Sequence, residues 1–252
     1  MTHPNIPSVP VGPFAVADLT RQDLVRTITE LGRGSDQPLV AYALHVGGLN
    51  TRRDREFVAS MERADVIYAD GGSVVLAARA AGARSIERAP TTDIGWDLLH
   101  ALRATTGRRP TVALIGGPEG LAERAAAALE AGADVSVVLA VDGYAQDWQP
   151  VVDKVHKVDP DMLVVGLGAP REMLWVDQWR TQLPPSIVLT CGGWFGYLAG
   201  EEQRAPRLLR RPGLEWIARL AQAPTRLGPR YVRGLWSTLV VTVAARRKRR
   251  SK

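Results

Sequence analysis

The sequence contains one cysteine, Cys191, and four widely separated histidines in 252 residues. A single cysteine excludes an internal disulfide and a zinc site built from cysteines, and it fits a reducing compartment. The histidines do not have the spacing of a metal site, so we expect no metal ion and no cofactor. No apolar run reaches the roughly 18 residues that span a bilayer. We expect no signal peptide, because the Pro-rich residues 1–13 have no apolar core.

The acidic and basic residues are unevenly distributed along the chain. The formal net charge is +6, but residues 204–252 contain 14 Lys/Arg and one acid, Glu215. The other 18 basic and 25 acidic residues give residues 1–203 a charge of about −7, against about +13 for the C-terminal segment. An acidic body with a basic end predicts one surface for a polyanion. We do not expect nucleic acid as a partner, because no RNA-binding module precedes the basic end.

Short apolar segments alternate with helix-like segments along residues 14–203, at the spacing of βα units. This pattern predicts an α/β fold with a Rossmann-like, mostly parallel sheet of about six strands flanked by helices. Ligands of such sheets bind outside the carboxyl ends of the strands. Gly-rich or acidic turns follow the predicted strands at Asp70-Gly71-Gly72, Gly116-Gly117, Asp142-Gly143, Gly166–Gly168 and Gly192-Gly193.

The clearest strand and turn lie at residues 161–172. Met162–Val165 is a short apolar run with β-branched residues, which is typical of a strand covered on both faces. Gly166 and Gly168 allow a sharp turn and the close approach of a ligand, and Pro170 suits the start of the next helix. Free N–H groups at that helix start would face an anion such as a phosphate. The same pattern also occurs where a turn only reverses the chain, so it does not decide the function alone.

By composition, the chain divides into four parts. We expect a disordered N-terminus at residues 1–13, an α/β domain at 14–203, a helical appendage at 204–245 and a basic tail at 246–252. The appendage combines helical, aromatic and basic residues, which is typical of a segment lying on an anionic membrane surface. The alternative is a solvated helical extension with a charged tail.

Several short motifs follow one another in order between Leu44 and Arg233. They are 64–71 (Ala-Asp-Val-Ile-Tyr-Ala-Asp-Gly), Glu87-Arg88 with Asp93, 114–120 (Leu-Ile-Gly-Gly-Pro-Glu-Gly), Asp142-Gly143-Tyr144, 160–170, Gly192-Gly193 with Phe195, and Ala199-Gly200 with 204–206 (Arg-Ala-Pro). The most specific is 213–220 (Gly-Leu-Glu-Trp-Ile-Ala-Arg-Leu), followed by Pro224, Arg226 and Arg230-Tyr231. In order and spacing, these motifs resemble the WecG/TagA/CpsF family of bacterial glycosyltransferases, glycosyltransferase family 26.

The resemblance implies the inverting, metal-independent transfer of a sugar from a UDP-sugar to a polyprenyl-diphosphate-linked saccharide. The sugar would be N-acetylmannosamine-like or a related hexose, and the product would serve cell-envelope or exopolysaccharide biosynthesis. The implied partners are the UDP-sugar, the lipid-linked acceptor and an anionic membrane surface, with a homo-oligomer left open. The implied location is cytoplasmic, peripheral on the inner face of the plasma membrane.

The sequence departs from the family pattern at several positions. Pro170-Arg171-Glu172-Met173 stands where the family commonly has Pro-Lys-Gln-Glu, and Gly196 stands where it has an acid. Pro90-Thr91 replaces a Thr-Gly pair, and either His45 or Asn50-Thr51 stands in for an asparagine-rich segment. These departures concern the identity of the sugar more than the class of reaction. They also keep open a non-catalytic protein that binds a nucleotide sugar or a lipid headgroup.

Inverting transfer needs a base for the acceptor hydroxyl and positive charge or N–H donors for the departing diphosphate. Asp70 is the candidate base, and the alternative is that it caps the next helix near Ser73. Arg88 is a candidate ligand of the diphosphate, and the alternative is a surface pair with Glu87. Asp93 is expected either to orient a sugar hydroxyl or to be the N-cap of a helix.

Further residues are expected around the donor and the lipid. Glu172 is expected either to contact the donor or to be an exposed acid in the first turn of a helix. Arg219, Arg226 and Arg230 are expected to bind the lipid diphosphate, and a general anionic-surface patch is the alternative. The other candidate substrate-binding residues are Asn50, Thr51, Gly166, Gly168, Pro170, Arg171, Gly192, Gly193 and Phe195.

A dinucleotide-binding oxidoreductase is a weaker hypothesis. Residues 116–120 (Gly-Gly-Pro-Glu-Gly) are rich in glycine but lack the G-x-G-x-x-G spacing of a dinucleotide site. The sequence therefore gives little support to NAD binding.

Overall fold

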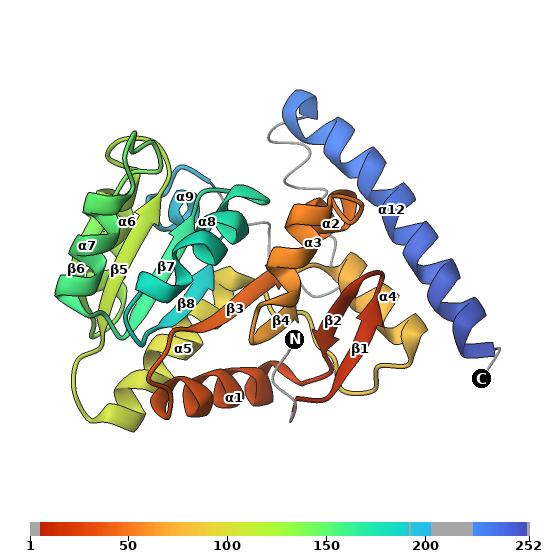
Figure 1. Cartoon of the computed structure of the whole chain (residues 1–252), viewed down its shortest axis with the longest axis horizontal. Helices are drawn as coiled ribbons and strands as arrows, with labels where there is room; N and C mark the ends of the chain where they lie inside the picture. Colours follow the sequence, from red (N-terminus) through yellow and green to blue (C-terminus); the bar gives the residue numbers. More distant parts are fainter. Residues whose placement is uncertain (1–5, 192, 203–223, 251–252) are drawn as a thin grey trace.

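Parallel strands form the centre of the molecule, as a computed structural model of the chain shows (Figure 1). The structure describes residues 6–191, 193–202 and 224–250. In this part of the chain, a six-stranded sheet has the order β4-β3-β8-β7-β5-β6, and all its neighbouring strands are parallel. The strands are β3 (Leu39–Leu44), β4 (Val66–Ala69), β5 (Thr111–Gly116), β6 (Ser136–Val141), β7 (Met162–Gly166) and β8 (Ile187–Thr190).

Helices cover both faces of this sheet, which confirms the predicted α/β fold. Helices α3, α7 and α8 pack on one face, and α1, α5, α6 and α9 pack on the other. Residues of β3, β4, β5 and β7 alternate between the two cores, so the strands are apolar throughout. Between residues 6 and 202 the α-helices are α1 (Arg21–Arg33), α2 (Val46–Asn50), α3 (Arg55–Glu62), α4 (Gly72–Ala81), α5 (Thr91–Thr106), α6 (Leu121–Gly132), α7 (Gln149–Val158), α8 (Arg171–Trp179) and α9 (Trp194–Leu198).

A hairpin near the N-terminus corrects one prediction. The sequence predicted disorder for residues 1–13, but β1 (Ser8–Val11) pairs antiparallel with β2 (Phe14–Ala17). Phe14 is 1% exposed, and its ring lies edge-on to that of Phe57 on α3 with 5.8 Å between the centroids. The Pro-rich composition concealed a strand whose partner follows directly, and whose contacts are with β2, α4 and α12.

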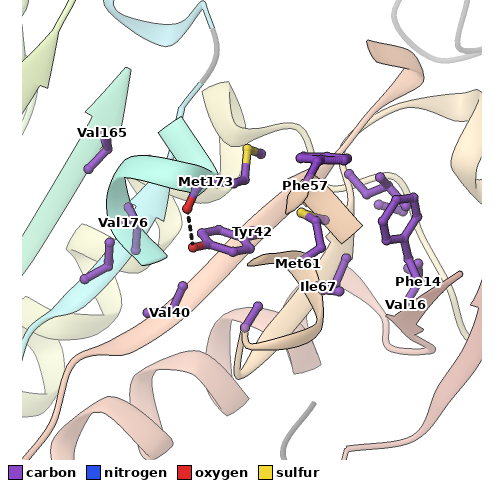
Figure 2. Packing of buried hydrophobic residues seen from close by; sticks show 14 of the residues in the cluster. Phe14, Val16, Val40, Tyr42, Phe57, Met61, Ile67, Val165, Met173 and Val176 are labelled. Carbon is purple, nitrogen blue, oxygen red and sulfur yellow. Dashed lines mark hydrogen bonds between the residues drawn. The ribbon is translucent and has the colours of Figure 1, made fainter. Parts of the chain in front are cut away.

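Tyr42 on β3 ties the sheet to α8 inside the core (Figure 2). Its hydroxyl donates a hydrogen bond of 3.0 Å to the main-chain oxygen of Met173, and Ser60 on α3 donates one of 2.9 Å to the same oxygen. Burial raises the pKa of Tyr42 far above its ordinary value, so this hydroxyl remains a donor. The contact fixes the start of α8 relative to β3.

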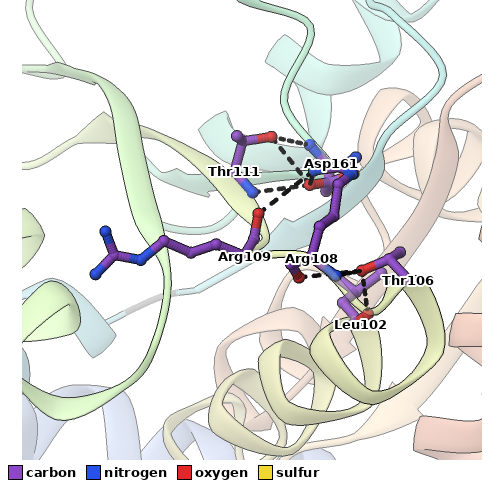
Figure 3. Close-up of polar contacts among 6 residues, drawn as sticks. All are labelled: Leu102, Thr106, Arg108, Arg109, Thr111 and Asp161. Atoms are coloured by element: carbon purple, nitrogen blue, oxygen red, sulfur yellow. Dashed lines mark hydrogen bonds and ion pairs between the residues drawn. The ribbon is translucent and has the colours of Figure 1, made fainter.

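Asp161 joins the amino ends of β5 and β7 by hydrogen bonds (Figure 3). Its carboxylate accepts hydrogen bonds from the main-chain N–H of Thr111 at 2.7 Å and from the hydroxyl of Thr111 at 3.0 Å. The guanidinium group of Arg108 also pairs with it. These contacts hold together the strand ends opposite the Gly-rich turns, so Asp161 has a structural role.

The last helix, α12 (Pro224–Arg250), lies along α4 and α2 at the β4 edge of the fold (Figure 1). It covers all of the described part of the predicted appendage, and it continues into the predicted basic tail as far as Arg250. Arg52 joins it to α2, because this guanidinium donates to the hydroxyl of Ser237 at 2.8 Å and to the main-chain oxygen of Leu49 at 2.9 Å. Among the described residues, no helix is both long and apolar enough to cross a membrane.

Candidate active site

The Gly-rich turns after β5, β6 and β7 are hydrogen-bonded to one another. The N–H of Gly117 donates to the oxygen of Gly166 at 3.1 Å, and the N–H of Gly143 donates to the oxygen of Gly117 at 2.8 Å. A Cβ atom on Gly116 would lie 2.3 Å from the oxygen of Gly166, and Gly116 has a φ of +141°. Only glycine permits this approach, so the turns form one continuous main-chain surface at the carboxyl edge of the sheet.

A shallow depression opens above these turns. It is lined by Gly117, Gly143, Tyr144, Gly166, Leu167 and Arg171. The guanidinium of Arg171 donates to the oxygen of Gly143 at 3.2 Å and lies 5.9 Å from the ring centroid of Tyr144. Tyr144 is 68% exposed, so its ring is available for stacking. The sequence analysis named Gly166 and Arg171 as site residues and missed Tyr144, although its place just after a strand and Asp142-Gly143 was a usable signal.

Asp70 lies three strands away, at the end of β4. Its N–H donates to the oxygen of Leu44 at 3.0 Å, so it stands beside the end of β3 at the same carboxyl edge. The side chain is half-buried, and the N-cap of α4 is Gly71 rather than Asp70. Burial, and next the charge of Asp70, raise the pKa of Tyr68.

The segment that carries Arg88 adjoins Asp70. The N–H of Ala89 donates to the oxygen of Ala69 at 2.8 Å, which places this segment against the end of β4. Arg88 itself is half-buried. The carboxylate of Glu87 accepts from the main-chain N–H of Arg21 at 2.9 Å. The fold therefore brings the segments of Asp70 and Arg88 together.

Asp93 is in the first turn of α5 and faces α1. The N-cap of α5 is Pro90, so the alternative that Asp93 is the N-cap is wrong. Its carboxylate lies 3.6 Å from the guanidinium of Arg21, which also pairs with Asp97 at 2.6 Å. Through its ion pair with Arg21, Asp93 helps to hold α1 against α5.

Glu172 is fully buried, which corrects the alternative of an exposed acid. It is 0% exposed, and its Oε2 accepts a hydrogen bond of 3.0 Å from the N–H of Gly168. Burial, and next the charge of Glu172, raise the pKa of Cys191 at the end of β8. Glu172 therefore supports the turn after β7 from below, and Pro170 between them is the N-cap of α8.

The remaining predicted residues lie on either side of this turn. Asn50 and Thr51 end α2 after β3, and the hydroxyl of Thr51 donates to the oxygen of Gly47 at 3.0 Å. Gly193 is the N-cap of α9. Phe195 is 2% exposed, and a Cβ on Gly166 would lie 3.1 Å from its ring. Phe195 thus packs beneath the site.

Part of the predicted site cannot be placed. Gly192 and Arg219 lie outside the described residues. Arg226 and Arg230 lie on α12, but the description does not extend to their side chains. Their assignment to the lipid diphosphate stays a prediction.

Helix α12 has two opposite faces of unusual composition. The inner face buries Gly234, Ser237, Thr238, Val241 and Thr242. The outer face exposes the large apolar residues Val232, Leu235, Trp236, Leu239, Val240 and Val243. Counted from the first residue, the inner set follows at 3, 4, 7 and 8 and the outer set at 3, 4, 7, 8 and 11, which is the spacing of a single helical stripe in each case. The apolar stripe that would normally face a core is therefore turned outward, and four exposed basic residues (Arg246, Arg247, Lys248 and Arg249) follow it.

A Rossmann-like sheet with a Gly-lined depression and an acid on the same carboxyl edge defines the class: an α/β protein whose ligand site is expected at the carboxyl ends of its parallel strands. Residues 9–252 match the model of the Glycosyl transferase WecG/TagA/CpsF family, which covers nearly the whole chain. The chain belongs to this family, and the resemblance inferred from its motifs is confirmed. The protein is thus a glycosyltransferase of cell-envelope polymer biosynthesis.

Proposed function

We propose that the protein is an inverting hexosyltransferase that needs no metal ion. It moves an N-acetylmannosamine-like or related hexose from a UDP-sugar to a polyprenyl-diphosphate-linked saccharide. It works on the inner face of the plasma membrane. The observation that carries the proposal is the placement of Asp70 and the Gly-lined depression on one edge of the sheet.

The spacing of the strands suits a nucleotide sugar. With neighbouring strands about 4.8 Å apart, the three steps from β4 to β7 separate Asp70 from the Gly turns by roughly 14 Å. The nucleotide would lie over β5, β6 and β7, with its base against Tyr144 and its diphosphate beside the guanidinium group of Arg171, which lines the depression. The sugar would extend toward β4, where Asp70 takes the proton of the acceptor hydroxyl.

The outer face of α12 supports a membrane-bound acceptor. A stripe of six exposed apolar residues followed by basic ones is the composition of a helix that lies in the interface of an anionic leaflet. Trp236, which is 66% exposed, would lie at headgroup level. The arginines of the appendage would then be near the lipid diphosphate.

Transfer from a panel of radiolabelled UDP-hexoses to a short-chain polyprenyl-diphosphate N-acetylglucosamine acceptor tests the proposal. Asp70→Asn should lose at least about a hundredfold in turnover, the usual contribution of a general base, and should keep UDP affinity. Asp36→Asn, at an exposed site before β3, is the matched control and should keep wild-type turnover. Activity should persist in EDTA. A wild-type protein that binds UDP-sugars but transfers none would support the non-catalytic alternative instead.

A further inference from the structure

Glu202 is an acid at the carboxyl edge that the sequence analysis did not select. The chain leaves α9 through Gly200, whose φ of +75° reverses its direction. The N–H groups of Glu201 and Glu202 then both donate to the oxygen of Gly196, at 2.9 and 3.0 Å. These bonds fix the main chain at Glu202, so its half-buried side chain returns along α9 toward the end of β8.

The carboxylate of Glu202 fills space that two glycines leave open. A Cβ on Gly193 would lie 3.4 Å from its Oε2, and a Cβ on Gly196 would lie 3.2 Å from its Cγ and 3.4 Å from its Cδ. Neither Gly193 nor Gly196 has a positive φ, so their backbone conformations do not require glycine. The two glycines therefore matter for the room they leave, and this room is filled by a carboxylate from the next turn.

The position of β8 in the sheet indicates what this carboxylate would meet. Strand β8 lies between β3 and β7. It is thus between the strand end that carries Asp70 and the turn that carries Gly166, where the proposed function puts the sugar of the donor. The neighbouring acid Glu201 pairs with Arg124 on α6, whereas Glu202 lies against Gly193 and Gly196, so the two consecutive acids face different surroundings.

Resting on the proposed function, we propose that Glu202 is a specificity-determining residue that accepts hydrogen bonds from hydroxyl groups of the donor sugar. An ionised carboxylate has two acceptor oxygens and can receive two neighbouring hydroxyls of a hexose. It distinguishes sugars by the positions of these hydroxyls, because only a hydroxyl within hydrogen-bond distance of a carboxylate oxygen gains a charge-assisted hydrogen bond. Its negative charge also disfavours the diphosphate at this point, which keeps the donor in one orientation.

A purely structural role makes a different prediction. A carboxylate near the first turn of α9 would also stabilise that helix end. If this were its only role, removing the charge would lower stability and would affect UDP and UDP-sugars equally. A role in sugar recognition affects the UDP-sugar and leaves UDP unchanged.

Calorimetric titration of the full chain with UDP and with a panel of UDP-hexoses distinguishes the structural role of Glu202 from a role in sugar recognition. Glu202→Gln and Glu202→Ala should bind the best UDP-hexose at least about tenfold more weakly, the effect of one charge-assisted hydrogen bond, and should bind UDP within about twofold of wild type. The matched control is Glu201→Gln, which should bind both ligands as the wild type does. Gly196→Asp combined with Glu202→Ala should recover part of the loss, because an acid on residue 196 reaches the same space.

The outcomes separate this inference from the proposed function. A wild type that binds and transfers a sugar, with Glu202→Gln unchanged or equally weakened for UDP and UDP-hexose, overturns the role of Glu202 alone. If Glu202→Gln loses binding of the UDP-hexose but not of UDP, and the wild type binds this UDP-hexose without ever transferring its sugar, the result supports the role of Glu202 and contradicts the transferase. A wild type that binds no UDP-hexose contradicts both.

Discussion

The buried carboxylate of Glu172 accepts a hydrogen bond of 3.0 Å from the main-chain N–H of Gly168, four residues earlier. This contact closes the turn between β7 and α8 and holds Gly166, which lines the depression, in place. An acid in the first turn of a helix usually faces solvent and benefits from the helix dipole. Glu172 instead lies under the site, where its charge raises the pKa of Cys191 after the larger effect of burial. It also adds to the raised pKa of Tyr68, after burial and the charge of Asp70.

Glu172→Ala should weaken both the fold and the donor site. The variant leaves the N–H of Gly168 without this acceptor, which should cost about 1–3 kcal/mol of unfolding free energy and reduce UDP affinity. Glu172→Gln keeps an acceptor oxygen of similar reach and should lose less in both respects. Urea denaturation and UDP titration measure the two effects. Equal behaviour of the two variants would contradict a specific role for the bond to Gly168.

The buried hydroxyl of Tyr42 should make the unfolding free energy depend on pH in alkaline solution. Burial raises the pKa of Tyr42 far above the value it has in the unfolded chain. Below about pH 10 the hydroxyl is protonated in both states. Above this pH only the unfolded chain loses the proton, so the unfolding free energy falls as pH rises, by up to about 1.4 kcal/mol per pH unit from this group.

Tyr42→Phe should therefore flatten this fall above pH 10. At neutral pH it should lose about 0.5–1 kcal/mol, a small value because Ser60 still donates to the oxygen of Met173. Ser60→Ala is the matched control, since it removes the other hydrogen bond to that oxygen but no titrating group, and it should keep the wild-type slope. Chemical denaturation from about pH 7 to about pH 11 measures the unfolding free energy at neutral pH and its slope above about pH 10. A Tyr42→Phe variant with the wild-type slope would refute the argument.

The outer face of α12 should bind vesicles that contain anionic lipid. Leu235→Gln combined with Leu239→Gln removes two side chains that are 65% and 54% exposed, and it should weaken binding at least about tenfold because buried apolar area drives interfacial docking. Replacing Arg246, Arg247, Lys248 and Arg249 by Gln should remove most of the salt dependence. Co-sedimentation with phosphatidylglycerol vesicles measures both effects.

The controls for this prediction are on the body of the protein. Arg53→Gln with Arg55→Gln removes two exposed positive charges near α3 and should leave the binding almost unchanged. Undiminished binding of the Leu235 and Leu239 double variant would mean that the stripe serves another purpose.

The sequence predicted the sheet well because its strands are buried on both faces. Apolar runs such as Met162–Val165, each ended by glycine or an acid, have few other structural solutions. The hairpin at residues 8–17 was missed because only four of its ten residues are buried and its prolines suggested disorder. Tertiary contacts with α3 and α4, which local composition cannot reveal, stabilise it.

The site was predicted less completely, for physical reasons that differ from residue to residue. Asp70 and the Gly turns could be found because strand ends in a parallel sheet meet at one edge. The burial of Glu172 and the pairing of Asp93 with Arg21 depend on elements distant in sequence. Glu202 could not be found because its place above Gly193 results from a turn at Gly200.

The order of the strands has a consequence for how two very different substrates reach one centre. Helix α12 lies beside α4 at the β4 end of the row, whereas β6 ends the row on the other side (Figure 1). With its apolar stripe against lipid, the protein would turn the β4 end toward the bilayer and the β6 end toward water. The lipid-linked acceptor and the water-soluble nucleotide sugar would then reach the carboxyl edge of the sheet from opposite ends, so neither would block the entry or departure of the other.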